Sequence, residues 1–250
     1  MRLKKWLSLV LWKGFIYKSA YDSLWKREKW VRMQLSKIEP GRRILDAGAG
    51  TGPYKDSCKH LMYVSHDLAE YDGKGDGTGF QSGKWKRPKY NIISDICAIS
   101  ESDSSFDAIL CTEVLEHIID PIGAIKEFSR LLKIGGVLII TAPFCCITHQ
   151  APFFFSTGYS HYFYEEVLGK MGFKLSELVF NGNYFDKAQE ELALTYQAAK
   201  KYAGPNFLEK CVFFLSSVIL IYIYRRWSKR DIASNTTSTQ NIQVLAIKMK

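Results

Sequence analysis

The hydrophobic positions of the chain follow two different periods in two different regions. Apolar side chains in residues 3–38 recur at the three- and four-residue spacing of an amphipathic helix. Gly14 and Glu28 interrupt this spacing and Pro40 ends it, so we expect two or three helices here. From Arg42 onward, short apolar runs alternate with helical segments. That alternation predicts an α/β fold, doubly wound around a mainly parallel sheet.

Several of the short runs have the length and apolar character of buried strands. Between them, Asp120 and Pro121 are suited to begin a helix, and the Gly135-Gly136 pair is suited to stop it. A second helix is expected from His161 to Met171. The predicted strands cover residues 44–45, 62–65, 91–94, 106–111, 137–141 and 173–180, with a final alternating run at 242–247.

The last quarter of the chain has a different composition. Residues 181–205 are helical and polar in pattern, and residues 206–224 are strongly apolar. The uncharged stretch from Cys211 to Tyr224 is 14 residues long, short of the roughly 20 that a membrane-spanning helix needs. If the final run rejoins the sheet, both ends of this segment lie on one side of any membrane. A single span is then excluded, which leaves a helix in the membrane plane, a re-entrant hairpin or a buried helix.

Charge is distributed unevenly along the chain. Residues 1–43 hold 12 Lys or Arg against 3 acids, whereas the remaining 207 residues hold 22 of each sign. Tryptophans lie among the N-terminal lysines, a mixture suited to a membrane–water interface; the alternative is a lid that packs on the body. We therefore divide the chain into four parts. They are a basic helical arm (1–41), a core (42–180), a helical insertion with an apolar segment and a polar linker (181–240), and the final strand of the core (241–250).

The overall composition indicates a folded protein in a reducing compartment. Hydrophobic residues make up 47% and charged residues 24% of the chain, as in ordinary globular domains. The six cysteines show no paired metal-binding spacing. The short apolar run from Trp6 to Trp12 is followed by Lys13 rather than by a cleavage site. We expect a cytoplasmic protein, located at the inner face of the membrane if the apolar segments bind lipid.

A glycine-rich turn directly follows the first predicted strand. In the sequence ILDAGAGTG, Gly48, Gly50 and Gly52 form GxGxG, and Asp46 lies two residues before the first glycine. Glycines let the backbone approach a ligand closely. A dinucleotide fingerprint has the spacing GxGxxG and binds a pyrophosphate, which the carboxylate of Asp46 would repel. The loop therefore favours a cationic ligand over NAD.

More polar side chains are expected at the ends of the following strands. Asp67 lies 21 residues after Asp46, where a carboxylate can accept both hydroxyl protons of a ribose. Asp95 and Ile96 follow the third strand, where they can contact an adenine edge. The fourth strand brings three further residues to the carboxyl edge of the sheet, where open α/β sheets bind ligands. They are Cys111, Thr112 and Glu113.

Together these segments resemble the class I methyltransferases, in particular the type 11 group. The resemblance rests on ILDAGAGTG, SHDLAEYD, SDI, SFDAILCTEVLEHIIDPIGAIKEFSRLLKIGGVLIITAP and GF, and covers residues 41–180 plus the final strand. It implies a Rossmann-like sheet of seven strands in the order 3-2-1-4-5-7-6, with the last strand antiparallel. It also implies S-adenosylmethionine as cofactor, bound by Asp46, Gly48, Gly50, Gly52, Asp67, Asp95, Ile96, Cys111, Thr112 and Glu113.

The acceptor of the methyl group is less defined by the sequence. The stretch APFCCITHQAPFFFSTGYSHYFYE resembles methyltransferases of bacterial surface-polysaccharide gene clusters. It implies a small-molecule acceptor, a hydroxyl of a glycan or of a lipid-linked glycan. A hydroxyl acceptor benefits from a general base, for which His117, His149 and His161 are candidates. We favour His149 as the catalytic residue because it follows the fifth strand, where an acceptor would lie.

Three alternatives remain open. Glu113, Glu116 and His117 form ExxEH, which His149 or His161 can complete, and related methyltransferases of RNA 3′ ends and quinone precursors hold a divalent metal with such a set; we assign no metal here. A non-catalytic S-adenosylmethionine-binding module is the second alternative. Methylation of nucleic acid is the third, but we expect no such partner because the body carries no excess positive charge. Peripheral membrane contact is expected.

Overall fold

The computed structural model describes residues 17–83 and 85–250, and within this part of the chain two compact units are distinguished. The first consists of Lys29–Val179 together with Asn241–Lys250, and we call it the core unit. The second consists of the described residues 17–28 together with Phe180–Gln240, and we call it the hairpin unit. The chain passes between the units inside a helix, inside a strand and just before the last strand.

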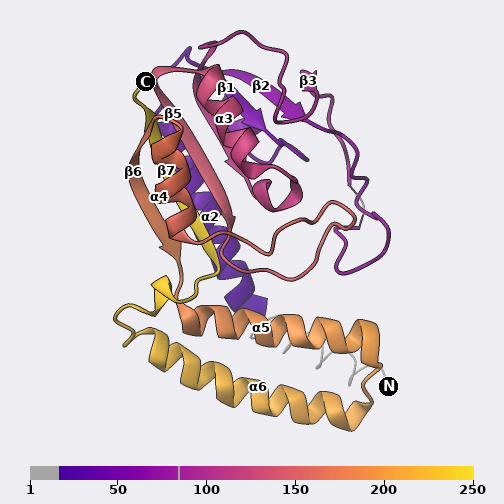
Figure 1. Ribbon diagram of the computed structural model, residues 1–250. Coiled ribbons are helices and arrows are strands. Elements are labelled where there is room, and N and C mark those ends of the chain that lie inside the picture. The colour runs from indigo at the N-terminus through magenta and orange to yellow at the C-terminus, as the bar shows by residue number, and fades with distance from the viewer. Residues whose placement is uncertain (1–16, 84) are drawn as a thin grey trace. The chain divides into compact units, whose positions relative to one another are not determined.

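The strands of the described chain form one seven-stranded sheet in the order β3-β2-β1-β4-β5-β7-β6 (Figure 1). Neighbouring strands from β3 through β5 are parallel, and β7 runs antiparallel to β5. This confirms the predicted fold class, strand order and reversed last strand. The strands are β1 (Arg43–Ala47), β2 (Met62–Asp67), β3 (Ile92–Ile93), β4 (Phe106–Thr112), β5 (Leu132–Pro143), β6 (Phe173–Asn181) and β7 (Asn241–Lys248).

Helices cover both faces of the sheet. Figure 1 shows α3 and α4 on the near face, while the second half of α2 packs on the other face, against side chains of β1, β4 and β5. The described helices are α2 (Tyr17–Ser36), α3 (Pro121–Leu131), α4 (His161–Lys170), α5 (Tyr184–Ala198) and α6 (Phe207–Ser228). Shorter turns of helix lie at Lys55–Cys58, Leu115–His117, Ala199–Ala203 and Ser234–Thr236.

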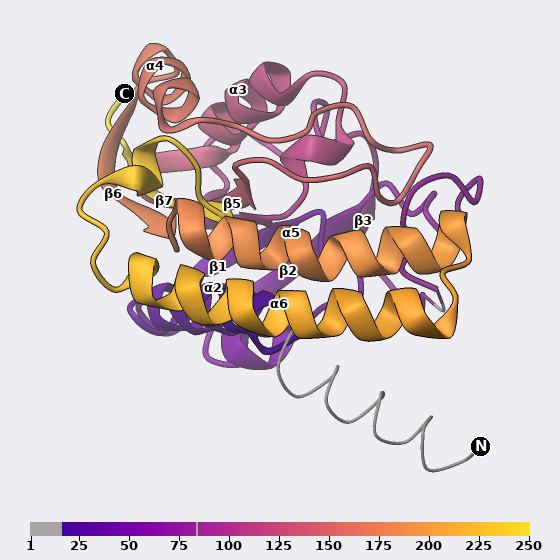
Figure 2. The ribbon, with the colours of Figure 1, turned by 90° about the horizontal axis from the view of Figure 1, so that it is seen from below.

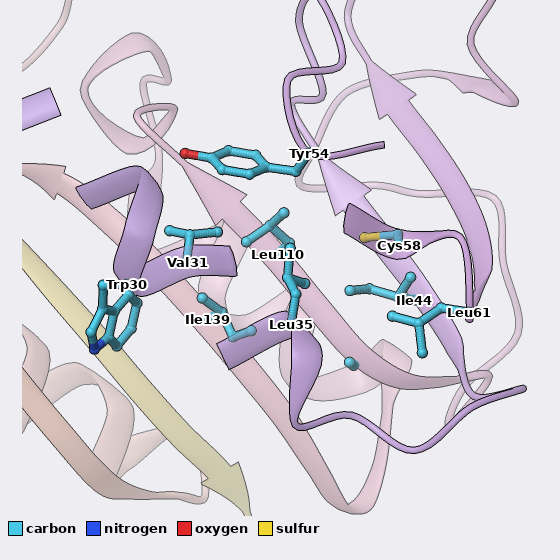
Figure 3. Close-up of a cluster of buried hydrophobic side chains, with 10 residues drawn as sticks. Trp30, Val31, Leu35, Ile44, Tyr54, Cys58, Leu61, Leu110 and Ile139 are labelled. Atoms are coloured by element: carbon cyan, nitrogen blue, oxygen red, sulfur yellow. The ribbon is translucent and has the colours of Figure 1, made fainter. Parts of the chain in front are cut away.

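The main hydrophobic core lies between α2 and the centre of the sheet (Figure 3). Leu35 from α2 meets Leu110 of β4 and Ile139 of β5, and all three side chains are fully buried. Alternate residues of a strand point to opposite faces, so these strands present another set of apolar residues to α3 and α4. Burial of each such side chain stabilises the fold by about 1.5–3 kcal/mol. The core thereby fixes the strand ends that carry the site.

The structure corrects the expected break in the N-terminal helical region. Helix α2 continues through Glu28 without interruption, because glutamate has a high helix propensity and its charge can stay at the surface. Trp30 is buried in the core, whereas Trp25 is exposed. The core unit therefore begins at Lys29 and includes the second half of the expected arm. Residues 3–16, with Gly14, lie outside the described residues.

The predicted start of α3 is confirmed, and its predicted end is wrong. The Asp120 carboxylate accepts a hydrogen bond of 2.8 Å from the Gly123 N–H, as an N-cap should. The helix ends at Leu131, and the Gly135-Gly136 pair lies inside β5. Gly135 has φ +78°, a conformation that glycine adopts without a steric penalty. The pair therefore forms an irregular start of the strand rather than a helix stop.

In the hairpin unit, α5 and α6 run antiparallel to each other (Figure 2). Both helices begin with a capping box, made by Asn183 with Asp186 and by Asn206 with Glu209. Between them the buried residues Ala193 and Ile221 form a small apolar cluster. By length and hydropathy, α6 is the one helix in the described part of the chain that could cross a membrane, but only 11% of its apolar window is buried.

Candidate active site at the carboxyl edge of the sheet

The glycine-rich loop after β1 wraps around the end of β2. The backbone N–H groups of Gly48 and Ala49 both donate to the carbonyl of His66, at 2.9 and 2.8 Å. Gly48 has φ +77°, and a Cβ atom at this position would overlap the side chain of Val114. Glycine is therefore required at position 48 for both its conformation and its lack of a side chain. The close contact also places the loop beside the turn that follows β4.

Asp46 is a deeply buried acid beneath the glycine-rich loop. Its side chain is 1% exposed, and the Tyr63 hydroxyl donates a hydrogen bond of 2.6 Å to its Oδ2. Burial raises the pKa of Asp46 to about 7, although the bond from Tyr63 acts in the opposite direction. Tyr63 is not among the site residues predicted from the sequence. The available signal was its position in β2, on the same face as Asp46 and one strand away.

Asp67 holds the glycine-rich loop in place from the end of β2. Its Oδ2 accepts from the Gly50 N–H at 2.9 Å, and its Oδ1 accepts from the Ala69 N–H at 2.8 Å. A carboxylate oxygen has more than one acceptor position, so Asp67 can still bind a ligand. Tyr90 donates to the Gly50 carbonyl at 2.8 Å, and the ring of Trp85 lies against Gly50.

Asp95 and Ile96, the predicted contacts of the adenine, lie just beyond β3. Asp95 is exposed and its Oδ1 accepts from the Cys97 N–H at 2.8 Å, while Ile96 is buried. This turn fixes the direction of the Asp95 side chain and leaves its second oxygen to solvent or ligand. The pair therefore lies at the same edge of the sheet as Asp67, which is where the sequence predicts it.

The residues that end β4 have three different environments. Cys111 is fully buried within the strand, and burial raises the pKa of its thiol well above the usual value. Thr112 is partly exposed. Glu113 has φ +53°, a strained conformation for a residue other than glycine. Its Oε1 accepts from Thr141 at 2.9 Å and from Asn241 at 2.6 Å, so it joins the ends of β4, β5 and β7.

A compact group of possible metal ligands follows this turn. One ligand atom each from Glu116, His117 and His149 lie within 4.8 Å of one another. Nδ1 of His117 lies 2.6 Å from the Phe153 carbonyl, and Nδ1 of His149 lies 3.0 Å from the Ile147 carbonyl. A carbonyl only accepts, so each Nδ1 carries a proton, and the neutral form of each ring has its lone pair on Nε2. Both imidazoles are therefore suited to binding a cation or accepting a proton.

His117 is held in its neutral form. Burial lowers its pKa to about 4, and the nearby His149 contributes in the same direction. The two rings lie 4.7 Å apart and nearly perpendicular. Nε2 of His117 is buried and lacks a hydrogen-bond partner among the described residues, with Glu116 Oε1 at 3.7 Å. The group brings together three residues of the predicted set, whereas Glu113 and His161 are not part of it.

Two loops are joined by backbone hydrogen bonds beside this group. The N–H of Phe80 donates to the Thr148 carbonyl at 3.0 Å, and the N–H of Gln150 donates to the Phe80 carbonyl at 2.9 Å. A third bond, also 3.0 Å, runs from the Asp76 N–H to the Ala151 carbonyl. This pairing holds the backbone of His149 on both sides. It joins loops about 70 residues apart in the chain, so no local sequence signal indicated it.

A glycine loop with a buried acid, and further acids at the next two strand ends, characterises a nucleoside-binding enzyme of the doubly wound class. The sequence model of the methyltransferase domain family matches residues 21–171. The chain belongs to this family. This assignment confirms the expected enzyme class and its S-adenosylmethionine cofactor. The type 11 group and the polysaccharide gene-cluster resemblance remain predictions.

Individual relatives cover part of the chain. It is 30% identical to the demethylmenaquinone methyltransferase of Renibacterium salmoninarum over 125 residues, 47% of this chain and 49% of that protein. It is 36% identical to a ubiquinone biosynthesis O-methyltransferase of Xanthomonas oryzae over 104 residues, 40% of this chain and 43% of that protein. The chain thus spans about half the length of the curated relatives it matches.

A solved structure supports the fold over a longer range. Phosphoethanolamine N-methyltransferase 2 of Haemonchus contortus, in complex with S-adenosyl-L-methionine, superposes with a TM-score of 0.51. The match covers 90% of this chain and 53% of the nematode protein, at 16% identity. At this level of identity the similarity shows the fold alone.

Proposed function

We propose that the protein transfers the methyl group of S-adenosylmethionine to a hydroxyl oxygen of a small-molecule acceptor. The observation that supports this proposal is the place of His149. The backbone of His149 is paired with that of Phe80. The ring of His149 lies against the ring of His117, and His117 belongs to the helical turn that directly follows Val114. Val114 itself contacts Gly48 of the glycine-rich loop. The imidazole of His149 is thus linked, through His117 and the turn after Val114, to the loop that would hold the cofactor.

In this proposal the cofactor lies across the carboxyl edge of the sheet. Asp67 binds the ribose hydroxyls, while Asp95 and the backbone of Ile96 contact the adenine. The glycine-rich loop and Asp46 lie beside the methionine part, whose positive charge a buried carboxylate favours. Because the Cys111 side chain is buried in the strand, the turn from Cys111 to Glu113 takes part through its backbone. Gly52 completes the loop.

The chemistry needs few groups from the protein, because the sulfonium already activates the methyl group. The acceptor oxygen attacks the methyl carbon, the carbon–sulfur bond breaks and S-adenosylhomocysteine leaves. The acceptor proton passes to Nε2 of His149, which has its lone pair because Nδ1 donates to Ile147. Alignment of the acceptor in line with the breaking bond supplies most of the rate enhancement.

The acceptor class that the site favours is a phenolic hydroxyl, such as that of a quinone precursor. The ring of Phe154 lies 5.2 Å from His149 and 6.3 Å from His117, so an aromatic acceptor can stack beside the proposed base. Two relatives are named as a demethylmenaquinone methyltransferase and as an O-methyltransferase of ubiquinone biosynthesis, which supports an acceptor related to the quinones.

A hydroxyl of a glycan or lipid-linked glycan is the second candidate acceptor. Tyr162, Glu165 and Glu166 line a shallow pocket at the start of α4. Aromatic rings beside carboxylates are suited to sugar recognition, because the ring covers the apolar face of a sugar and the carboxylates accept from its hydroxyls.

The group formed by Glu116, His117 and His149 also fits a divalent cation. It combines a buried carboxylate with two imidazoles whose protonated Nδ1 atoms are held by backbone carbonyls, the usual arrangement around protein metal ligands. In this alternative, Nε2 of His149 would bind the ion together with Glu116 and His117 instead of accepting the proton, and the ion would lower the pKa of a bound acceptor hydroxyl. If the protein binds such an ion, it would act as a metal-dependent O-methyltransferase.

Cofactor binding is the first test. Calorimetric titration with S-adenosylmethionine should give micromolar affinity, and NADH should give no heat of binding. Asp67→Ala should abolish binding, whereas Asp56→Ala, which removes an exposed carboxylate with an ion pair to Lys59, should leave it unchanged. Absence of binding to the intact protein would exclude methyl transfer and leave an inactive relative of the family.

Methyl transfer is the second test. With radiolabelled cofactor, label should pass to catechol-type acceptors, and His149→Ala should reduce kcat by about 100-fold, the range for a general base. Lipid-linked and free glycans serve as competing acceptors in the same assay. Label on glycans alone would favour the second acceptor class.

The cation has a separate test. Removal of bound metal with a chelator, followed by addition of Mg²⁺, Mn²⁺ or Zn²⁺, shows whether methyl transfer needs a divalent cation.

A further inference from the structure

Helix α6 presents a continuous apolar face to solvent. Five side chains along this face are between 58% and 71% exposed. Successive members are four, three, four and three residues apart, so they lie in one line along the helix. They are Leu208, Val212, Leu215, Ile219 and Tyr222. We call this line the α6 stripe. Water-exposed rows of large apolar residues mark surfaces that bind something.

The other side of α6 is already used inside the hairpin unit. Ser217 and Ile221 are buried, and Phe213 stacks on Tyr196 of α5 with ring centroids 6.1 Å apart. The packing with α5 therefore accounts for one face of the helix and leaves the α6 stripe facing away from α5. Apolar residues on one side of α6 thus pack against α5, and those on the other side form the exposed α6 stripe.

The pairing with α5 excludes α6 as a membrane-spanning helix. The two helices run antiparallel side by side, so a bilayer that contained the length of α6 would also contain α5. Helix α5 carries Asp186, Lys187, Glu190 and Glu191, and charged side chains are costly to bury in the hydrocarbon of a bilayer. A position in the plane of the interface, with the α6 stripe toward the acyl chains, avoids this cost.

The charges around the stripe indicate which surface it meets. Residues 199–230 contain seven Lys or Arg residues and one acid, Glu209. Most of the bases lie at the two ends of α6, and exposed aromatic rings at Tyr202 and Trp227 accompany them. Each basic residue near an anionic bilayer strengthens the attraction to it. A second copy of the chain would bring the same excess of positive charge to the contact, which disfavours self-association through this face.

We propose that α6 is an in-plane membrane anchor for anionic lipid surfaces. The α6 stripe enters the boundary of headgroups and acyl chains, and the basic residues at both helix ends bind lipid phosphates. All of these residues belong to the hairpin unit, so lipid binding does not depend on the proposed methyl transfer.

The test is co-sedimentation of the full chain with vesicles. The wild-type protein should sediment with vesicles in which about one lipid in three is phosphatidylglycerol, and should remain largely soluble with pure phosphatidylcholine. Leu215→Glu combined with Ile219→Glu should reduce the bound fraction at least tenfold. Ser216→Glu, a neighbouring exposed position outside the stripe, is the matched control and should bind as wild type does.

The electrostatic part has its own variants. Lys229→Gln with Arg230→Gln should weaken binding to the anionic vesicles several-fold. Lys59→Gln with Lys170→Gln removes the same charge from exposed positions of the core unit and should have little effect. Unchanged affinity for S-adenosylmethionine in every variant shows that the core unit is still folded.

Three results would overturn the inference. Vesicle binding that survives the change of Leu215 and Ile219 would mean that another segment carries it. A dimer in sedimentation velocity that becomes monomeric in this variant, without vesicle binding by the wild type, would make the α6 stripe an interface between two copies. Resistance of the bound protein to alkaline carbonate extraction would indicate a spanning helix instead of an in-plane one.

Discussion

At the scale of single residues, the hydrogen bond from Tyr63 to Asp46 decides the charge beneath the glycine-rich loop. The bond favours the ionised carboxylate, which burial otherwise disfavours. Tyr63→Phe should therefore weaken S-adenosylmethionine binding at pH 7 by about tenfold, since hydrogen bonds to buried charged groups are worth about 1.5–3 kcal/mol. Calorimetry measures the change. Tyr202→Phe, at an exposed tyrosine, is the control, and equal affinities for all three proteins would exclude the role.

The raised pKa of Asp46 predicts that the stability of the cofactor-free protein depends on pH. The pKa of Asp46 is about 7 in the folded protein against an ordinary value of 3.8, so the folded state binds the proton more tightly. Its stabilising effect is complete below about pH 4 and is lost as the pH rises to 7. Relative to Asp46→Asn, the wild type should lose at most about 1.4 kcal/mol per pH unit across this interval. Urea unfolding at pH 5, 6, 7 and 8 measures the difference, and parallel curves would contradict it.

At the scale of elements, the backbone pairing between the loop of Phe80 and the loop of His149 should be needed for the full catalytic rate. A glycine makes this close pairing possible. Gly79 has φ +62°, and a Cβ atom there would overlap the carbonyl of Thr148, next to His149. Gly79→Ala should separate the loops and reduce kcat about tenfold or more. Gly77 has φ +83° with open space around it, so Gly77→Ala carries the same backbone cost, about 1 kcal/mol, without the overlap. Similar kcat values for the two variants would show that the pairing is not needed.

Element by element, the sequence predicted what depends on local pattern. The runs at 106–111 and 137–141 were recognised as strands because buried parallel strands are continuously apolar, and the cap of α3 at Asp120 was recognised from one side chain. The end of α3 was not, because Gly135-Gly136 is compatible with both a helix stop and a strand irregularity. Only the tertiary pairing of β4 with β5 decides between them.

The candidate site divides in the same way. Asp46, Asp67 and Asp95 lie at the predicted edge of the sheet because the ends of parallel strands meet there, and their role in binding the cofactor stays a prediction. The contact of His117 with His149 joins residues 32 positions apart, and the bond from Tyr63 crosses between two strands. Such contacts depend on the direction of each side chain in the folded sheet. Strand periodicity predicts on which face of the sheet a side chain lies, but not which residue it contacts there.

At the scale of the whole molecule, the two units should respond to different ligands. The core unit encloses many fully buried side chains, whereas the hairpin unit has a cluster of two buried residues, Ala193 and Ile221. Backbone amides in α5 and α6 should therefore exchange hydrogen faster than those of β4 and β5, since local opening breaks few apolar contacts. Mass-spectrometric hydrogen exchange on the full chain measures both units at once.

Ligand addition then separates the units. S-adenosylmethionine at 100 times its Kd should stabilise the core unit by about 2.7 kcal/mol and slow exchange in β1 and β4 by up to about 100-fold, with little change in α6. Anionic vesicles should do the opposite, protecting α6 and leaving β4 as it was. The Leu215→Glu and Ile219→Glu double variant should lose only the second effect. Protection of α6 by the cofactor alone would show that the two units unfold together, because binding energy would then reach amides outside the unit that holds the ligand.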